Sequence, residues 1–190
     1  MDTDLDYSVL IVVDAIDSAT EGEDTVYNNE LSPEMAAFRA NVAEVVELAH
    51  ENEIPVIFCN DAHIEGLDQE LELWGPHGIK GRTRIFPEIE VEDCDLIIPK
   101  RRYSAFFQTD LELTLSEIGA DTLIVVGCDT NVCVLHTLAD AFYRNFKTVV
   151  VEDATITFLG VGTQEGAIDM FGKCYGSEIV SVEELKSTLA

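Results

Sequence analysis

Continuous apolar runs alternate with amphipathic helical segments along this chain, and this alternation constrains the fold more than any other feature. Strands that are apolar on both faces are typical of a parallel sheet covered by helices on both sides. We therefore expect an α/β fold with a doubly wound, mainly parallel six-stranded sheet in a single domain spanning residues 1–190. The predicted strands are 8–13, 55–60, 95–99, 122–126, 148–151 and 178–180.

Helix-start signals lie between these runs. Ser32 can cap a helix whose first turn contains Pro33. The segments Thr109–Glu112 and Ser181–Glu184 both have the spacing of a capping box. Further helices are expected near residues 132–142 and 163–173, whereas residues 61–94 are rich in Gly and Pro and are expected to be irregular.

The charge excludes several classes of partner. The chain carries 37 acidic and 11 basic residues, for a net charge of −26. Nucleic acids and anionic membranes are disfavoured, because binding them requires clustered Lys and Arg. Dispersed acidic residues favour adaptation to high salt, the alternative being an ordinary acidic enzyme.

Three features favour a cytoplasmic protein: five scattered cysteines, an acidic start at Met1–Asp6 and the lack of an 18-residue apolar run.

Reactive side chains follow the predicted strands. Ligands of open α/β sheets bind at the carboxyl ends of the strands, so we expect Asp14, Lys100 and Cys133 to meet there. The first turn of a helix and the Lys100 ammonium are expected to lower the pKa of the Cys133 thiol, and Asp14 can exchange a proton with it. The alternative is that Cys133, like Cys59, is a small buried apolar residue.

A second group has the composition of a metal site. Asp61 and His63 are followed by His77 in the loop WGPHGIKG. One carboxylate and two imidazoles fit catalytic zinc or an iron site of the two-His-one-carboxylate kind. The alternative is that these histidines bind nothing. His50 and His136 are expected to be structural.

Three segments together resemble the isochorismatase-like cysteine hydrolases. VVGCDTNVCVLHTLADAF (125–142) is similar to their nucleophile segment, which carries Gly-x-x-Thr-x-x-Cys-Val, and the segments 100–112 and 10–14 resemble their lysine and acid segments. The resemblance implies an Asp14–Lys100–Cys133 triad, oxyanion donors at the backbone N–H groups of Asp129 and Cys133, and a cis peptide bond between Cys128 and Asp129. It also implies a homo-oligomer.

Within that family, the nicotinamidase branch has an Asp-x-His and a later histidine on the corresponding loop. The resemblance implies a divalent metal, zinc or else iron or manganese, held by Asp61, His63 and His77, with Trp74 beside the substrate ring. The implied reaction is hydrolysis of nicotinamide to nicotinate and ammonia through a thioester, with the metal holding the pyridine nitrogen.

The chain departs from the nicotinamidase pattern beside these residues. Ile16 and Ala19 stand where a glutamine and a phenylalanine are usual, Gly75 replaces a proline, and Gly78 replaces a cysteine. A different amide, ureido or N-carbamoyl substrate is therefore the main alternative. A catalytically silent binding protein is a further one. A metal-dependent oxygenase is disfavoured, because it has no use for the lysine and the cysteine.

Overall fold

The computed structural model describes residues 5–18 and 32–190. Ala19 and the first four residues of the acidic start lie outside this part of the chain. Among the described residues, no helix has both the length and the apolar character that a membrane span requires.

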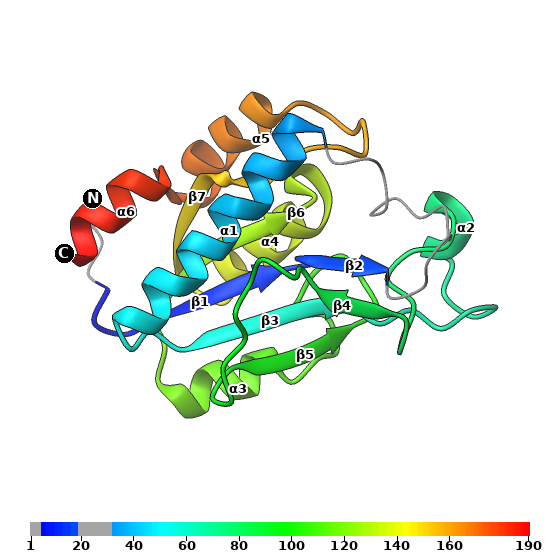
Figure 1. The fold of residues 1–190 in the computed structure, drawn as a ribbon, viewed down its shortest axis with the longest axis horizontal. Coiled ribbons are helices and arrows are strands. Elements are labelled where there is room, and N and C mark those ends of the chain that lie inside the picture. Colours follow the sequence, from blue (N-terminus) through cyan, green and yellow to red (C-terminus); the bar gives the residue numbers. More distant parts are fainter. Residues whose placement is uncertain (1–4, 19–31) are drawn as a thin grey trace.

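A six-stranded parallel sheet forms the centre of the protein (Figure 1). The strand order is β5-β3-β1-β6-β7-β8, so the chain winds outward from β1 in one direction and then from β6 in the other. The predicted doubly wound fold is confirmed, and the direction changes between β1 and β6, where such sheets bind ligands. The strands are β1 (Ser8–Val13), β3 (Val56–Asp61), β5 (Leu96–Lys100), β6 (Thr122–Cys128), β7 (Lys147–Ile156) and β8 (Glu178–Val180).

Helices cover both faces of this sheet. Alternate residues of β1 point to opposite sides: Leu10 and Val12 join one apolar cluster, and Val9 and Ile11 join the other. The first cluster is closed by α1 (Pro33–Glu51), which crosses the sheet in Figure 1, and by α6 (Val182–Leu189). The second is closed by α3 (Leu111–Ile118), α4 (Leu135–Tyr143) and α5 (Gln164–Met170).

Two of the three predicted helix caps are confirmed. The Ser32 side chain accepts a hydrogen bond from the backbone of α1, and Ser181 forms both bonds of a capping box with Glu184. The capping box expected at Thr109 is wrong. Helix α3 is instead preceded by Asp110, which makes no side-chain cap bond. The Thr109 hydroxyl donates to the carbonyl of Ala105 and accepts the N–H of Leu111, the first residue of the helix.

Residues 61–94 contain more regular structure than expected. They include the short helix α2 (Glu70–Trp74) and the strand β4 (Thr83–Ile85), which pairs antiparallel with β2 (Ile16–Ser18). These pieces are five and three residues long, too short for a hydrophobic period to mark them. Two π-helical turns, η1 (Thr130–Val134) and η2 (Phe171–Tyr175), adjoin α4 and α5.

Candidate active site

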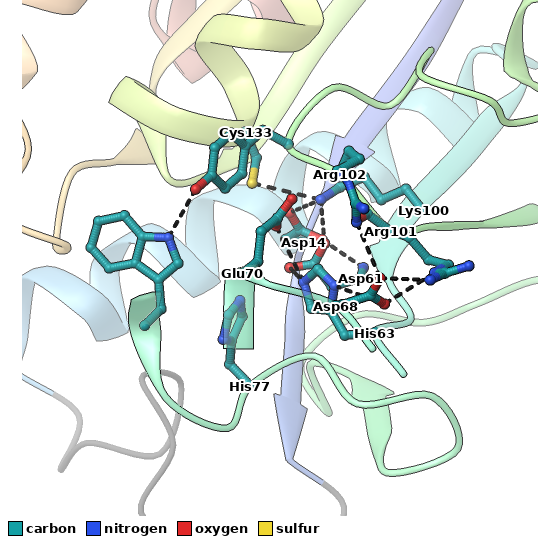
Figure 2. A network of polar contacts seen from close by, with 12 residues as sticks. Asp14, Asp61, His63, Asp68, Glu70, His77, Lys100, Arg101, Arg102 and Cys133 are labelled. Atoms are coloured by element: carbon teal, nitrogen blue, oxygen red, sulfur yellow. Dashed lines mark hydrogen bonds and ion pairs between the residues drawn. The ribbon is translucent and has the colours of Figure 1, made fainter. Parts of the chain in front are cut away.

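Four strands deliver reactive side chains to one edge of the sheet (Figure 2). Asp14 directly follows β1, Asp61 ends β3, and Lys100 ends β5. Cys133 lies in η1, immediately after β6. The structure thus brings the three expected triad residues together with one of the expected metal ligands.

The close approach of β1 and β6 depends on Gly127. This residue pairs with Val13 and has φ +116°, and a Cβ atom there would lie 1.9 Å from the Val13 carbonyl oxygen. Only glycine fits at this position. The peptide bond between Cys128 and Asp129, which follows shortly after Gly127, is cis, as the resemblance implied.

The ammonium of Lys100 is the centre of the polar network in Figure 2. Its Nζ lies 2.7 Å from Oδ2 of Asp14 and 2.5 Å from Oδ1 of Asp61, and it donates to Sγ of Cys133 at 3.6 Å. Asp14 Oδ1 also accepts the backbone N–H of Asp61 at 2.8 Å. Ligand atoms of Asp14, Asp61 and Cys133 lie within 4.8 Å of one another, and the lysine supplies the cation among them.

Burial and neighbouring charges act together on the pKa values of this network. Burial and the nearby charge of Asp61 raise the pKa of Asp14 to about 7, against the opposing effect of Lys100. Burial would also raise the pKa of Asp61, but Lys100 and His63 outweigh it and the pKa falls below the usual range. For Lys100, burial is outweighed by the two carboxylates, so its pKa rises and it stays charged.

The expected low pKa of the Cys133 thiol is wrong. Burial raises it well above the ordinary value, and the charge of Lys100 only partly offsets this effect. Cys133 lies in a π-helical turn and its residue is only 7% exposed, so solvent gives a thiolate little support. The resting sulfur is therefore protonated, and a base must take its proton during attack.

The expected metal ligands converge beside this network. Ligand atoms of Asp61, His63 and His77 lie within 4.8 Å of one another, and all three residues are buried. The His63 and His77 rings meet edge to face, with their centroids 4.9 Å apart. His77 Nδ1 contacts the Gly75 carbonyl at 2.8 Å, an arrangement that orients the ring of a metal ligand.

The surroundings of His63 fit a divalent cation. Neither of its buried ring nitrogens has a hydrogen-bond partner, yet Nε2 lies 3.4 Å from Asp61 Oδ2 and 3.5 Å from Glu70 Oε2. Ligand atoms about 2.1 Å from a tetrahedral metal are separated by about 3.4 Å. The donor set therefore suits a divalent metal, and Glu70, which is 4% exposed, adds a second carboxylate to it.

The loop that carries His63 is held by a second ion cluster. Asp68 accepts the backbone N–H of Ile64 at 2.7 Å and pairs with Arg101 at 2.6 Å and with Arg102 at 3.2 Å. The bonds from Arg101 lower the pKa of Asp68 below its usual range. These contacts connect the loop after β3 to the end of β5, beside Lys100.

Cys133 shares one narrow pocket with the metal donors Asp61, Glu70 and His77. The indole of Trp74 donates to the hydroxyl of Tyr103 at 3.1 Å, and both rings line it. A wider cavity shares Glu70 and Tyr103 with this pocket, but Cys133 does not line it. The described lining of the narrow pocket consists of Asp61, Glu70, Trp74, His77, Tyr103, Asp129, Val132, Cys133, Phe158 and Leu159.

Sequence reasoning missed several of these residues. Glu70 and Glu72 look alike in the sequence, yet only Glu70 is buried in the site. Tyr103 lay within a segment singled out by the resemblance, whereas nothing in the sequence marked Phe158 or Leu159. The other histidines have structural contacts: His50 pairs with Asp95 at 2.9 Å, and His136 Nδ1 contacts the Val132 carbonyl at 2.6 Å.

Solved structures with a similar fold include amidases. The fold matches an N-carbamoylsarcosine amidase from Thermoplasma acidophilum with a TM-score of 0.80 and 31% identity, covering 93% of this chain and 96% of that one. It matches the nicotinamidase PncA from Bacillus subtilis with a TM-score of 0.77 and 26% identity, covering 92% and 99%.

Sequence comparison gives the same family. An uncharacterized isochorismatase family protein, PncA of Bacillus subtilis, is 36% identical over 65% of this chain and 73% of its own length. A ureidoacrylate amidohydrolase, RutB of Pantoea ananatis, is 44% identical over 50% of this chain, which spans only 39% of that relative. The family model of the isochorismatase domain matches residues 8–184. The chain therefore belongs to the isochorismatase family of hydrolases.

Proposed function

We propose that this protein is a metal-dependent amidohydrolase of the nicotinamidase type, which converts nicotinamide to nicotinate and ammonia. The observation that carries the proposal is the pocket itself. Its described lining includes Cys133 and two of the three metal donors, Asp61 and His77, together with Trp74, Tyr103 and Phe158. Aromatic walls favour a flat aromatic carboxamide over an aliphatic one.

The charge of the pocket favours a neutral substrate. Asp61, Glu70 and Asp129 line it, and among the described lining residues there is no lysine or arginine. Ureido and N-carbamoyl acids carry a carboxylate, for which the described lining offers no lysine or arginine partner, since Asp61 and Glu70 would themselves be engaged by the metal. Nicotinamide carries no charge.

Acylation uses the triad. Asp14 accepts the thiol proton as the sulfur of Cys133 forms a C–S bond to the amide carbon. The carbonyl oxygen becomes an oxyanion, which the backbone N–H groups of Asp129 and Cys133 stabilise. Asp14 then gives its proton to the amide nitrogen, the C–N bond breaks, and ammonia leaves a thioester on Cys133.

Deacylation reverses these roles. Asp14 takes a proton from a water molecule whose oxygen attacks the thioester carbon. The C–S bond breaks, the sulfur regains the proton from Asp14, and the product leaves as the carboxylic acid, which ionises to the carboxylate by giving its proton to solvent. Lys100 remains charged throughout and stabilises the negative charge that moves between Asp14 and Cys133, since its Nζ lies within 3.6 Å of both side chains.

Asp61, His63 and His77 would hold the metal, with Glu70 as an added carboxylate. When bound, the metal would supply a Lewis-acid position for the ring nitrogen of the substrate. The residues of the chain orient the substrate around that position: Trp74 and Tyr103 flank the ring, and Phe158 and Leu159 line the same pocket.

The second candidate is an amidase acting on a ureido or N-carbamoyl compound. It is favoured by the ureidoacrylate amidohydrolase and N-carbamoylsarcosine amidase among the similar proteins. It is also favoured by Ile16, which is buried in β2 opposite Ile85 and offers no amide to a substrate.

Ammonia release from a panel of compounds tests the proposal. The panel contains nicotinamide, pyrazinamide, ureidoacrylate and N-carbamoylsarcosine, each with and without a chelator. We expect turnover of the two pyridine-like carboxamides and its loss with chelator. Turnover confined to the carbamoyl and ureido compounds would replace this proposal with the second candidate.

A further inference from the structure

The segment between β7 and α5 forms one wall of the substrate pocket. It contributes Phe158 and Leu159, which line the same pocket as Cys133 and the metal donors Asp61 and His77. The segment between β7 and α5 is not part of the turn that carries Cys133, and it is not helical. Its distance from Cys133 is therefore set by side-chain contacts between the segment and that turn.

The side chain of Asp129 makes these contacts. Its Oδ2 accepts the backbone N–H groups of Phe158 at 2.8 Å and Leu159 at 3.0 Å, and its Oδ1 accepts the N–H of Asn131 at 2.8 Å. The residue is 3% exposed, so water does not compete for these bonds. A single carboxylate therefore joins the nucleophile turn to the pocket wall.

The main chain of Asp129 is fixed at the same time. Its carbonyl oxygen accepts the N–H groups of Val132 and Val134, both at 3.1 Å, on either side of Cys133. A shift of the Asp129 side chain therefore also moves the turn whose N–H groups face the reacting carbonyl.

Asn131 forms hydrogen bonds with both ends of the segment between β7 and α5. Its Nδ2 donates to the Thr157 hydroxyl at 2.7 Å and to the Thr163 carbonyl at 3.2 Å. A Cβ atom at Gly162 would lie 2.6 Å from Asn131 Oδ1, so the segment packs directly against this side chain. The segment is thus held at its ends by Asn131 and at its centre by Asp129.

We propose that Asp129 is a positioning residue: its carboxylate holds the oxyanion turn and the Phe158–Leu159 wall at a fixed separation, so that a bound carbonyl lies over the sulfur of Cys133. The proposal deepens the cysteine-hydrolase mechanism proposed above and rests on it. It assigns Asp129 a side-chain role distinct from that of its backbone N–H.

The test compares two reactions of the same sulfur. Acylation by 4-nitrophenyl acetate forms a C–S bond, passes through an oxyanion and releases nitrophenolate, whereas alkylation by iodoacetamide displaces iodide without forming an oxyanion. Neither reagent depends on which amide is the natural substrate, so failure of the nicotinamide assignment leaves this test intact. Labelling of Cys133 is verified by mass spectrometry.

Two variants of Asp129 and one control are needed. D129N keeps one carbonyl oxygen and the side-chain shape, and D129A removes all three acceptor bonds. D153N is the control, because Asp153 also accepts a backbone N–H, that of Val182 at 2.9 Å, but lies outside the described pocket lining. Melting curves show whether each variant is folded at the assay temperature.

We expect acylation to slow by about 10-fold in D129N and by about 100-fold in D129A, the size of effect produced by loss of an oxyanion donor. Alkylation should change by less than about threefold, and D153N should alter neither rate. Equal slowing of both reactions would overturn the proposal, because it would place the damage at the thiol. Unchanged acylation in folded D129N would overturn it as well, whatever the melting temperature.

Discussion

Lys100 and Asp14 form a fully buried ion pair, with Nζ 2.7 Å from Oδ2 and neither side chain exposed to solvent. The same ammonium lies 2.5 Å from Asp61. Removing Lys100 would leave the carboxylates of Asp14 and Asp61 facing each other in a space closed to water. Leaving buried charges without a partner in this way strongly destabilises the folded state.

We therefore predict that K100M lowers the free energy of unfolding by about 3–5 kcal/mol at pH 7.5, measured by urea denaturation. The loss should shrink near pH 5, where Asp14 takes up a proton. K147M is the matched control, since Lys147 pairs with Asp121 at the surface at 3.4 Å and its removal should change little. Equal stability of K100M and wild type would contradict the prediction.

Substitution of Cys133 should abolish turnover without unfolding the protein. C133A is expected to reduce ammonia release by at least about 1,000-fold, since loss of a nucleophile removes the covalent pathway. C174A, at an exposed cysteine, should keep wild-type activity. Substantial ammonia release by folded C133A would exclude the thioester mechanism.

The raised pKa of Asp14 predicts an acid limb in the pH profile. Burial and the charge of Asp61 raise this pKa to about 7, and only the ionised carboxylate can take the proton of Cys133. We expect kcat/KM to fall about tenfold per pH unit below pH 7. D14N should lack measurable activity across the whole range. A profile that stays flat down to pH 5 would remove Asp14 as the base.

The same shift predicts a dependence of stability on pH. The pKa of Asp14 is higher in the folded protein than the value of about 3.9 expected in the unfolded chain. The folded state therefore binds this proton more tightly between about pH 4 and pH 7, and the resulting stabilisation is lost as the pH rises through 7. Urea denaturation over this range should give a smaller slope for D14N than for wild type.

The amount of bound metal should fall when one of the proposed metal ligands is substituted. H63A and H77A are expected to lower affinity for zinc by at least about 100-fold, and E70Q by about 10-fold. H50A is the control, because His50 pairs with Asp95 instead. Elemental analysis after dialysis measures the bound metal without reference to activity. Reconstitution with zinc, iron or manganese then identifies which ion restores turnover.

Full metal content in H63A would disprove the assignment. Unaltered binding in E70Q alone would limit the site to Asp61 and the two histidines.

The acidic composition predicts that salt stabilises the fold. With a net charge of −26, the acidic side chains repel one another at low ionic strength, and salt screens that repulsion. We expect the melting temperature to rise by about 5 °C or more between 0.1 and 2 M KCl, with NaCl giving the same rise at equal ionic strength. A flat or falling curve would favour an ordinary acidic enzyme.

The sequence was sufficient to predict the sheet and its reactive edge. The predicted strands 8–13 and 122–126 are apolar on both faces, which favours buried, parallel strands. Once the sheet is known to be doubly wound, its topology brings Asp14 and Cys133 to the same edge. The approach of Lys100 follows because β5 ends at that residue.

Other features depend on tertiary contacts that no local pattern encodes. Asp14 has φ 51°, a left-handed conformation that Asp tolerates better than most residues but that the sequence does not require. The pKa of Cys133 departs from expectation because burial outweighs a neighbouring ammonium, and burial depends on the whole fold. Glu70 is distinguished from Glu72 only by the direction in which α2 points it.

The bare α-carbon at Gly127 has a consequence for substitution in this chain. Because the main chains of β1 and β6 touch there, any side chain at this position would push apart the two strands that precede Asp14 and Cys133. The spacing of those two residues is therefore sensitive to a position that does not itself line the described pocket.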